Sequence, residues 1–559
     1  MRRLLHVLLG LAALPAPLLA QPSVARFDWF DYRGWDPTDG QRPAANAYRN
    51  PILQGFYPDP SITRVGDDFY LVTSTFAYFP GIPVFHSRDL VSWTQIGNAI
   101  SRSEQLDFGR LGLSRGVFAP TISHKDGTFY ILNTCVDCGD NFIITARDPA
   151  GPWSNPVWLG DLRGGIDPAP FFDDDGRTWI VNNGPPEGTP RYQGHRAIWL
   201  QEFDLEHLRT FGPRRVLVDG GVDPSTNPIW IEGPHILKVN GWYYLVCAEG
   251  GTAMGHSQVV LRSRSVTGPY QPYEGNPILT QRDLPADRAN PVTSAGHAQL
   301  VQTSDGAWSA TFLAVRPYEG DYYNTGRETF LLPVTWEDGW PRILGRGRAI
   351  PMTHARPDLP RQPPPAVPTN GPFRLREEFN GAALPPYWMM VRNPRGDWLR
   401  LRNGGLELTA QHVPLGGMGN PAFVVRRQQH RNAEASTTLR FQPTGPGDEA
   451  GLAAFQNDDY FYALSVGRDG DHLALHLRRR AGPDDPQRGA VIATARLPGH
   501  SGEAVRLMIR TDSRTYSFFY AGPRGAWQQL GPAQDGTILS TRTAGGFVGA
   551  VFGMFAVAE

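Results

Sequence analysis

An aspartate held between two prolines is the first candidate for chemistry in this sequence. The stretch reads GFYPDPSI at residues 55–62, directly before a run typical of a β-strand. Proline fixes a backbone torsion and removes an amide donor, so the segment around Asp59 is stiff. A plain turn aspartate would explain this octapeptide by itself. Segments of similar type carry Asp167, Glu232 and His297, which favours a functional Asp59.

Three carboxylates and a histidine can divide acid and base work. Carboxylates brought together without a cation cluster raise one another's pKa, so that one can donate a proton while another accepts one. Hydrolysis of a glycosidic bond needs that division. Glu232 lies in PIWIEGPHI, where apolar neighbours disfavour its charged form, as suits a general acid; a structural carboxylate is the alternative. Asp59 has the shorter side chain, which leaves room for a water in front of it.

A metal site is the rival use of the same four side chains. Oxygen-rich sets suit calcium, but the sequence has no dense acidic ligand loop of the DxDxDG kind. The closest stretch, FFDDDGRTW at residues 171–179, fits a hairpin turn better. We therefore expect no metal in the catalytic step, while a structural calcium ion beside His297 stays open.

Five aromatic segments, each opened by a tight turn, indicate how these side chains are positioned. Their turns are Asp-Gly, Asn-Gly or a close variant, which is a β-hairpin signal. Five similar units in register favour an all-β fold with a five-bladed β-propeller over a β-sandwich. The segments are GDDFYLVTS (66–74), DGTFYILNT (126–134), DGRTWIVNN (175–183), NGWYYLVCA (240–248) and DGAWSATFL (305–313).

The residue eight positions before each turn begins the innermost strand of its blade. In a propeller the innermost strands lie side by side around the axis, so equivalent positions gather at one mouth of the central channel. We therefore expect five side chains to converge there. They are Asp59, Phe118, Asp167, Glu232 and His297.

The chain is too long for one hydrophobic core, and its pattern divides it into parts. Its 559 residues favour two or three domains. Residues 46–349 are the predicted propeller, and the proline-dense residues 350–372 are a semi-rigid linker. Alternating runs in residues 373–559 predict an antiparallel β-sandwich. Residues 21–45 are an N-terminal extension that we expect to pack against a blade.

The first twenty residues have the arrangement of an export signal. Arg2 and Arg3 form a charged start, residues 4–14 an apolar middle, and Ala20 a small residue for cleavage. A membrane anchor is the alternative, but the apolar stretch is short and is followed by two prolines. We expect a signal peptide at residues 1–20 and an exported protein, periplasmic or extracellular. The net charge of -1 gives no basic field for nucleic acid or anionic membranes.

Cysteines play a small part in the predicted fold. The chain has 3 of them, too few for a disulfide framework. Cys135 and Cys138 form CVDC, without a second pair to complete a zinc site, so a local disulfide or two thiols is expected. Cys247 in WYYLVCAEG is typical of a buried strand residue.

Six stretches in the propeller part carry a family resemblance. They are NPILQGFYPDPSI, STFAYFPGIPVFHSRDLVSWTQIG, GVFAPTISHKDGTFY, GIDPAPFFDDDG, WIEGPHI and SAGHAQLV, within about residues 49–345. This part resembles glycoside hydrolase family 43, the β-xylosidase and α-L-arabinofuranosidase family, whose fold is a five-bladed propeller. LREEFNG and PAFVVRRQQH resemble the concanavalin-like domain found behind that propeller, from which a loop commonly narrows the active-site mouth.

The resemblance implies an inverting mechanism and a role for each ionisable residue. Asp59 matches the general base, Glu232 the general acid, and Asp167 the carboxylate that tunes and orients the acid. His297 matches the histidine under the pocket floor, which in some members contacts a channel ion. No cofactor is implied beyond that possible structural calcium.

Three further residues match binding positions of the family. Arg316 in FLAVRP resembles the arginine that binds sugar hydroxyls, with a surface ion pair as the alternative. Phe76 and Phe118 match apolar walls of the terminal-sugar subsite. Many members carry tryptophan where this chain has Phe118, which leaves the shape of that subsite open.

The implied activity is exo-acting release of terminal β-D-xylose from xylo-oligosaccharides or xylan, fragments of the plant cell wall. Release of α-L-arabinofuranose is the closest rival, because the same three carboxylates serve both sugars. A sugar-binding propeller without catalysis would lack a carboxylate, and an invertase-like retaining enzyme would carry NDPNG where this chain has YPDPS. The sequence does not indicate an oligomeric state.

Overall fold

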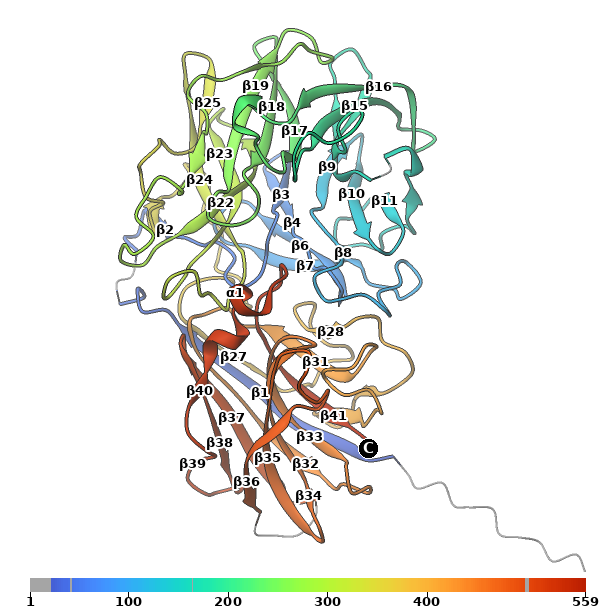
Figure 1. Cartoon of the computed structure of the whole chain (residues 1–559), viewed down its shortest axis with the longest axis vertical. Helices are drawn as coiled ribbons and strands as arrows, with labels where there is room; N and C mark the ends of the chain where they lie inside the picture. The colour runs from blue at the N-terminus through green and yellow to red at the C-terminus, as the bar shows by residue number, and fades with distance from the viewer. Residues whose placement is uncertain (1–21, 41–42, 163, 498–501) are drawn as a thin grey trace, which may run out of the picture.

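The protein consists of two all-β parts, which lie one above the other in Figure 1. The computed structural model describes residues 22–40, 43–162, 164–497 and 502–559. The predicted signal peptide at residues 1–20 lies outside these ranges. Within them, no helix combines the length and the apolar character that a membrane crossing requires.

The first part is a five-bladed β-propeller, as predicted, and each blade is an antiparallel sheet. Blade one is β3 (Ser61–Val65), β4 (Asp68–Val72), β6 (Gly81–Ser87) and β7 (Thr94–Ile100); blade two is β8 (Gly116–Val117), β9 (Thr121–Lys125), β10 (Thr128–Val136), β11 (Asp140–Ala146) and β12 (Val157–Trp158); blade three is β13 (Ile166–Phe172), β14 (Thr178–Gly184), β15 (Ala197–Asp204) and β16 (Arg209–Asp219); blade four is β17 (Glu232–Val239), β18 (Trp242–Glu249), β19 (Ser257–Ser263), β20 (Gln271–Pro272) and β21 (Leu279–Thr280); blade five is β22 (Thr293–Gln302), β23 (Trp308–Val315), β24 (Glu328–Glu337) and β25 (Trp340–Arg342).

The innermost strands of the blades form a closed ring around the channel. Each contacts the next, in the order β3, β9, β13, β17, β22 and back to β3. A hairpin ends each inner strand. In blade two it is a two-residue turn, where Asp126 and Gly127 have φ values of 49° and 73°, whereas in blades three and five it is a longer loop, at residues 173–177 and 303–307. Because the hairpin sets the register of its blade, a count back from the turn reaches a similar level of each blade.

The second part is a β-sandwich of two antiparallel sheets. One sheet runs β29 (Leu399–Leu401), β30 (Leu406–Thr409), β1 (Val24–Trp35), β32 (Asn432–Phe441), β37 (Ala504–Asp512), β38 (Thr515–Ala521) and β39 (Gln528–Gln529), with β27 (Phe373–Glu377) on β1 and β40 (Gln534–Asp535) on β38. The other runs β36 (Ala490–Arg496), β35 (His472–Ala481), β34 (Tyr460–Asp469), β33 (Glu449–Asn457), β41 (Val551–Val557), β31 (Ala422–Arg427), β28 (Met389–Val391) and β5 (Tyr78–Phe79).

The expected position of the N-terminal extension is wrong for most of its length. Strand β1 does not pack against a blade; it pairs with β27, β30 and β32 in the interior of a sandwich sheet. Its buried side chains Phe27, Phe30 and Tyr32 belong to the sandwich core. Only the end of the segment reaches the propeller, where Asp36 pairs with Arg316 of blade five.

The two parts share a core, so the sandwich is in a position to shape the propeller's channel mouth. Strand β5 leaves blade one and pairs with β28 of the sandwich. One buried cluster joins Phe108 and Val117 of the propeller to Phe423 and Phe455 of the sandwich. The predicted linker also follows the propeller surface, because β26 (Thr353–Ala355) pairs with β2 (Ala47–Arg49).

Candidate active site

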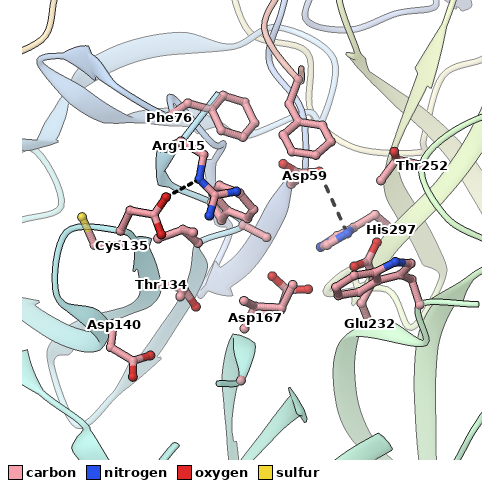
Figure 2. A pocket seen from close by; sticks show the side chains of 18 of the residues that line it. Asp59, Phe76, Arg115, Thr134, Cys135, Asp140, Asp167, Glu232, Thr252 and His297 are labelled. Atoms are coloured by element: carbon pink, nitrogen blue, oxygen red, sulfur yellow. Dashed lines mark hydrogen bonds and ion pairs between the residues drawn. The ribbon is translucent and has the colours of Figure 1, made fainter. Parts of the chain in front are cut away.

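A cavity of about 660 Å³ opens where the first strands of the blades begin, and part of its wall comes from the sandwich. All five residues that the hairpin spacing placed together line it: Asp59, Phe118, Asp167, Glu232 and His297. Figure 2 shows the side chains of Asp59, Asp167, Glu232 and His297 facing one another across this space. The convergence predicted from spacing is therefore present in the fold.

Three of these residues adopt a backbone conformation that non-glycine residues rarely take. Asp59, Asp167 and His297 have φ values of 54°, 55° and 53°. Left-handed backbone costs free energy for residues with a Cβ and is found most often at functional sites. The same torsion at equivalent places in blades one, three and five turns each of these side chains into the cavity.

Asp59 is held as a charged carboxylate. The Ser74 hydroxyl donates to Oδ2 at 2.5 Å, and Arg327 Nη1 lies 3.1 Å from Oδ1. His297 Nδ1 lies 4.0 Å from Oδ1. Burial alone would raise the pKa of Asp59, but Arg327, His297 and the Ser74 hydrogen bond outweigh burial and lower it below its ordinary value. Asp59 is thus ionised at neutral pH and able to accept a proton.

The pKa of Glu232 is displaced in the opposite direction. Burial raises its pKa well above the ordinary value, and the negative charges of Asp167 and Asp59 add to that effect, against the opposing charges of Arg327 and Arg196. A carboxyl group that keeps its proton near neutral pH can donate it to a leaving group. One pocket therefore holds an ionised carboxylate and a protonated one.

Asp167 lies beside the acid and is fixed by the backbone next to it. The Gly233 amide donates to Asp167 Oδ2 at 3.0 Å. Burial raises the pKa of Asp167 to about 6, the charge of Asp59 also raises it, and His297 acts in the opposite direction. Because Gly233 follows Glu232 directly, this hydrogen bond ties the position of Glu232 to Asp167.

Aromatic rings close one end of the cavity. Phe76 and Phe118 meet edge to face with centroids 5.6 Å apart, so both residues matched to apolar walls are at the pocket. Phe547 of the sandwich lies 5.8 Å from each of them and stacks on Phe76. Its backbone amide donates to Ser114 Oγ at 2.8 Å. Phe547 follows the short helix α1 (Thr541–Ala544) and was not identified from the sequence.

Arg327, and not Arg316, is the arginine beside Asp59 in the pocket. Arg327 lines the cavity, contacts Asp59, and lies over the Phe547 ring at 5.1 Å. The sequence resemblance had placed Arg316 there, and that placement is wrong. Arg316 lies behind the pocket, where Nε and Nη2 donate to Glu328 at 2.6 and 2.8 Å and Nη1 donates to Asp36.

Arg316 instead anchors the loop that carries Asp59. Glu328, its partner, also accepts the Gly55 amide at 2.9 Å, in the stretch that leads to Asp59. Asp36 brings in the N-terminal segment and accepts the Arg431 amide of the sandwich at 2.8 Å. The three side chains thus join propeller, sandwich and N-terminal segment in one buried network.

We expect Arg316→Met to destabilise the protein by about 3–5 kcal/mol, because it leaves Asp36 and Glu328 buried without their cation. Unfolding in urea, followed by tryptophan fluorescence, measures the change. Arg346→Met is the control, since Arg346 pairs with Asp283 at an exposed site and should change stability little. A raised KM with unchanged stability would return Arg316 to the role that the resemblance gave it.

The described residues offer no ready-made metal site. No cluster of three or more His, Cys, Asp or Glu side chains suited to a metal ion occurs among them. Burial lowers the pKa of His256 to about 4 and that of His235 to about 3, so these two buried histidines are uncharged at neutral pH. A calcium ion near His297 stays a prediction, as does the expectation that catalysis needs no cofactor.

The cysteine alternatives are resolved. Cys135 and Cys138 form a disulfide, and Cys135 lines the cavity. The disulfide therefore joins the end of β10 to the turn that follows it, at the pocket wall. Cys247 is free and fully buried in β18, as expected for a strand residue.

Comparison with known proteins identifies the family of the chain. The family model of glycosyl hydrolases family 43 matches residues 48–341, and that of the β-xylosidase C-terminal concanavalin A-like domain matches residues 376–559. A xylosidase/arabinosidase of Butyrivibrio fibrisolvens is 38% identical over 91% of this chain and 95% of its own. A non-reducing end α-L-arabinofuranosidase of Bacteroides ovatus is 38% identical over 92% of each chain.

Solved structures show the same architecture. The crystal structure of a GH43_12 protein retrieved from a capybara gut metagenome matches with a TM-score of 0.87 and 38% identity, over 96% of this chain and 100% of that one. A xylan β-1,4-xylosidase from Bacillus halodurans matches with a TM-score of 0.81 and 34% identity, over 91% and 96%. From its paired carboxylates, its two domains and these matches, the chain is a glycosidase that belongs to glycosyl hydrolase family 43.

Proposed function

We propose that this protein removes terminal β-D-xylose from xylo-oligosaccharides with inversion at the anomeric carbon. The observation that carries the proposal is the opposite displacement of two pKa values in one pocket, lowered at Asp59 and raised at Glu232. An inverting glycosidase needs that pair, a base for the attacking water and an acid for the leaving oxygen.

Each residue then has a defined task. Asp59 takes a proton from the water that attacks the anomeric carbon, and Glu232 gives its proton to the glycosidic oxygen. Asp167 keeps the acid protonated and in place. Arg327, already fixed by Asp59, is available to donate to sugar hydroxyls, while His297 helps to keep Asp59 charged.

The closed aromatic end supports an exo mode of action. Phe76 is 1% exposed and packs against Phe118 and Phe547, so three aromatic rings wall the pocket at that end. A pocket closed on one side accepts the end of a chain and not its middle. The aromatic walls offer the apolar face of the terminal sugar a surface to pack on.

Release of α-L-arabinofuranose is the second candidate, because relatives that carry both names are similar to this chain over most of its length. The test is kcat/KM on 4-nitrophenyl β-D-xylopyranoside and 4-nitrophenyl α-L-arabinofuranoside under the same conditions. We expect the higher kcat/KM on the xyloside. A higher value on the arabinofuranoside would assign the enzyme to the second sugar.

The natural substrate proposed here is a fragment of xylan or arabinoxylan. Several similar proteins carry the name β-xylosidase, and one of Vibrio is named xylan 1,3-β-xylosidase. The charged, apolar and small residues of the first twenty positions support export to the periplasm or the medium. Plant cell-wall fragments are found outside the cytoplasm, so the two proposals are consistent.

We expect Asp167→Asn to move the alkaline limb of the kcat/KM profile to lower pH, by about one unit or more. The negative charge of Asp167 raises the pKa of Glu232, so its removal lowers that pKa and the acid loses its proton earlier as the pH rises. The kcat/KM profile is measured on xylobiose between about pH 4 and pH 10.

Asp140→Asn serves as the control for this shift. Asp140 lines the same cavity, but it is not among the charges that displace the pKa of Glu232. Its replacement should leave the alkaline limb in place. An alkaline limb that stayed fixed in Asp167→Asn would mean that Asp167 does not tune the acid.

A further inference from the structure

The cavity wall also includes side chains next to Glu232 that have no task in the proposed mechanism. Figure 2 shows Phe76 and Glu232 on opposite sides of the pocket. Trp230 and Arg196 also line the cavity, and the charge of Arg196 acts on Asp167 and Glu232. Trp230 is 40% exposed whereas Phe76 is 1% exposed, so the Glu232 side is the open one.

We propose that Trp230 and Arg196 form the binding site for the leaving sugar and that this site takes a pyranose ring. The inference rests on the proposed function, in which Glu232 protonates the glycosidic oxygen. The bond to be cleaved must then lie at Glu232, with the terminal sugar toward the phenylalanines. The next sugar of the chain extends to the other side of the acid, where Trp230 lies.

Trp230 is held with its ring outward by its own backbone. Its φ is 52°, and its amide donates to the Gly194 carbonyl at 2.8 Å. Gly194 itself has a φ of 82°, and a Cβ there would lie 3.0 Å from the Ile229 Cβ, so the close approach needs glycine. The next residue, Ile231, is fully buried. A large apolar ring in strained backbone and open to solvent adds little to folding, and such strain is characteristic of ligand sites.

Arg196 is fixed beside that ring. Its guanidinium carbon lies 5.0 Å from the centre of the Trp230 ring. Nη2 donates to the Gly164 carbonyl at 2.7 Å, and both Nη2 and Nε donate to Asn183 Oδ1, at 2.6 and 3.0 Å. Nη1 donates to no hydrogen-bond acceptor in the described part of the chain, so it is available to a ligand.

This pair of groups fits a sugar ring in particular. An indole offers a flat apolar surface that packs against the C–H face of a pyranose, and a fixed guanidinium offers a donor to its hydroxyl oxygens. A leaving group without a ring, such as fluoride, would make neither contact. The subsite therefore favours oligosaccharides over glycosides with small leaving groups.

The experiment compares kcat/KM on xylobiose, whose leaving group is a pyranose, with kcat/KM on β-D-xylopyranosyl fluoride. We expect Trp230→Ala to lower the ratio of the two values about tenfold or more. Trp230→Phe keeps a flat ring and should keep the ratio within about threefold of the unmodified protein. Trp527→Ala, at an exposed tryptophan of the sandwich, is the matched control and should leave the ratio unchanged.

The other outcomes overturn the inference in distinguishable ways. If Trp230→Ala lowered both values equally, or lowered the melting temperature together with both, Trp230 would shape the pocket without binding the leaving sugar. An unchanged ratio would mean that the leaving sugar does not contact Trp230. If the unmodified protein hydrolysed neither substrate, the proposed function would be wrong, and the inference would fall with it.

Discussion

Asp59→Asn is expected to lower kcat by about two to four orders of magnitude, the usual contribution of a general base. The amide cannot accept a proton from the attacking water. Its oxygen can still accept from Arg327, and its NH2 group can donate to the Ser74 hydroxyl, which can also act as an acceptor, so the fold around it should persist. Steady-state kinetics on xylobiose and a thermal unfolding curve measure the two effects separately.

Asp173→Asn is the matched control for this variant. Asp173 is a buried aspartate of blade three that lies outside the cavity. It accepts hydrogen bonds from Lys238 Nζ at 2.7 Å and from the Tyr243 hydroxyl at 2.8 Å. Its replacement should affect stability more than kcat. An Asp59→Asn protein that kept more than about a tenth of the wild-type kcat would exclude Asp59 as the base.

Glu232→Gln is expected to have an effect that depends on the leaving group. On xylobiose kcat should fall by about two to four orders of magnitude, because a sugar alkoxide leaves poorly without a proton. On 2,4-dinitrophenyl β-xyloside the fall should be far smaller, since that phenolate leaves without help. The alkaline limb of the pH profile should also vanish, because it reflects loss of the Glu232 proton.

The direction in which activity changes with pH follows from the two displaced pKa values. Activity needs Glu232 protonated and Asp59 ionised, so it declines as pH rises through the raised pKa of Glu232 and as pH falls through the lowered pKa of Asp59. Equal losses on xylobiose and on the dinitrophenyl substrate would show that Glu232 is not the proton donor. The unmodified enzyme, assayed on both substrates, gives the reference ratio.

The convergence of the pocket residues could be predicted because propeller repeats are local. The hairpin after each inner strand sets the register of its blade, by a two-residue turn at Asp126 and Gly127 and by a longer loop at residues 303–307, so a constant count back reaches a similar level in each blade. The closed ring of inner strands then brings Asp59, Asp167 and Glu232 together. Each blade's own sequence and the propeller geometry are therefore enough to predict which side chains meet in the pocket.

The features that the sequence misplaced or did not identify depend on contacts between segments far apart in the chain. Arg316 and Arg327 flank one irregular connection between β23 and β24, and without a two-residue turn the sequence does not show which one faces the channel. Strand β1 has an alternating pattern, but its partners β27 and β32 begin only at residues 373 and 432. Phe547 reaches the pocket only because the sandwich docks on blades one and two.

In the proposed mechanism, water activated by Asp59 attacks the anomeric carbon directly while Glu232 protonates the leaving oxygen. Asp59 from blade one and Glu232 from blade four face each other across the channel mouth, an arrangement that suits the wide carboxylate separation of inverting enzymes, roughly 6.5–9.5 Å. Proton NMR in the first minutes of hydrolysis of a β-xyloside, before mutarotation, tests this mechanism most directly. We expect α-xylose as the first product; β-xylose formed first would mean that the configuration is retained and that water does not attack directly.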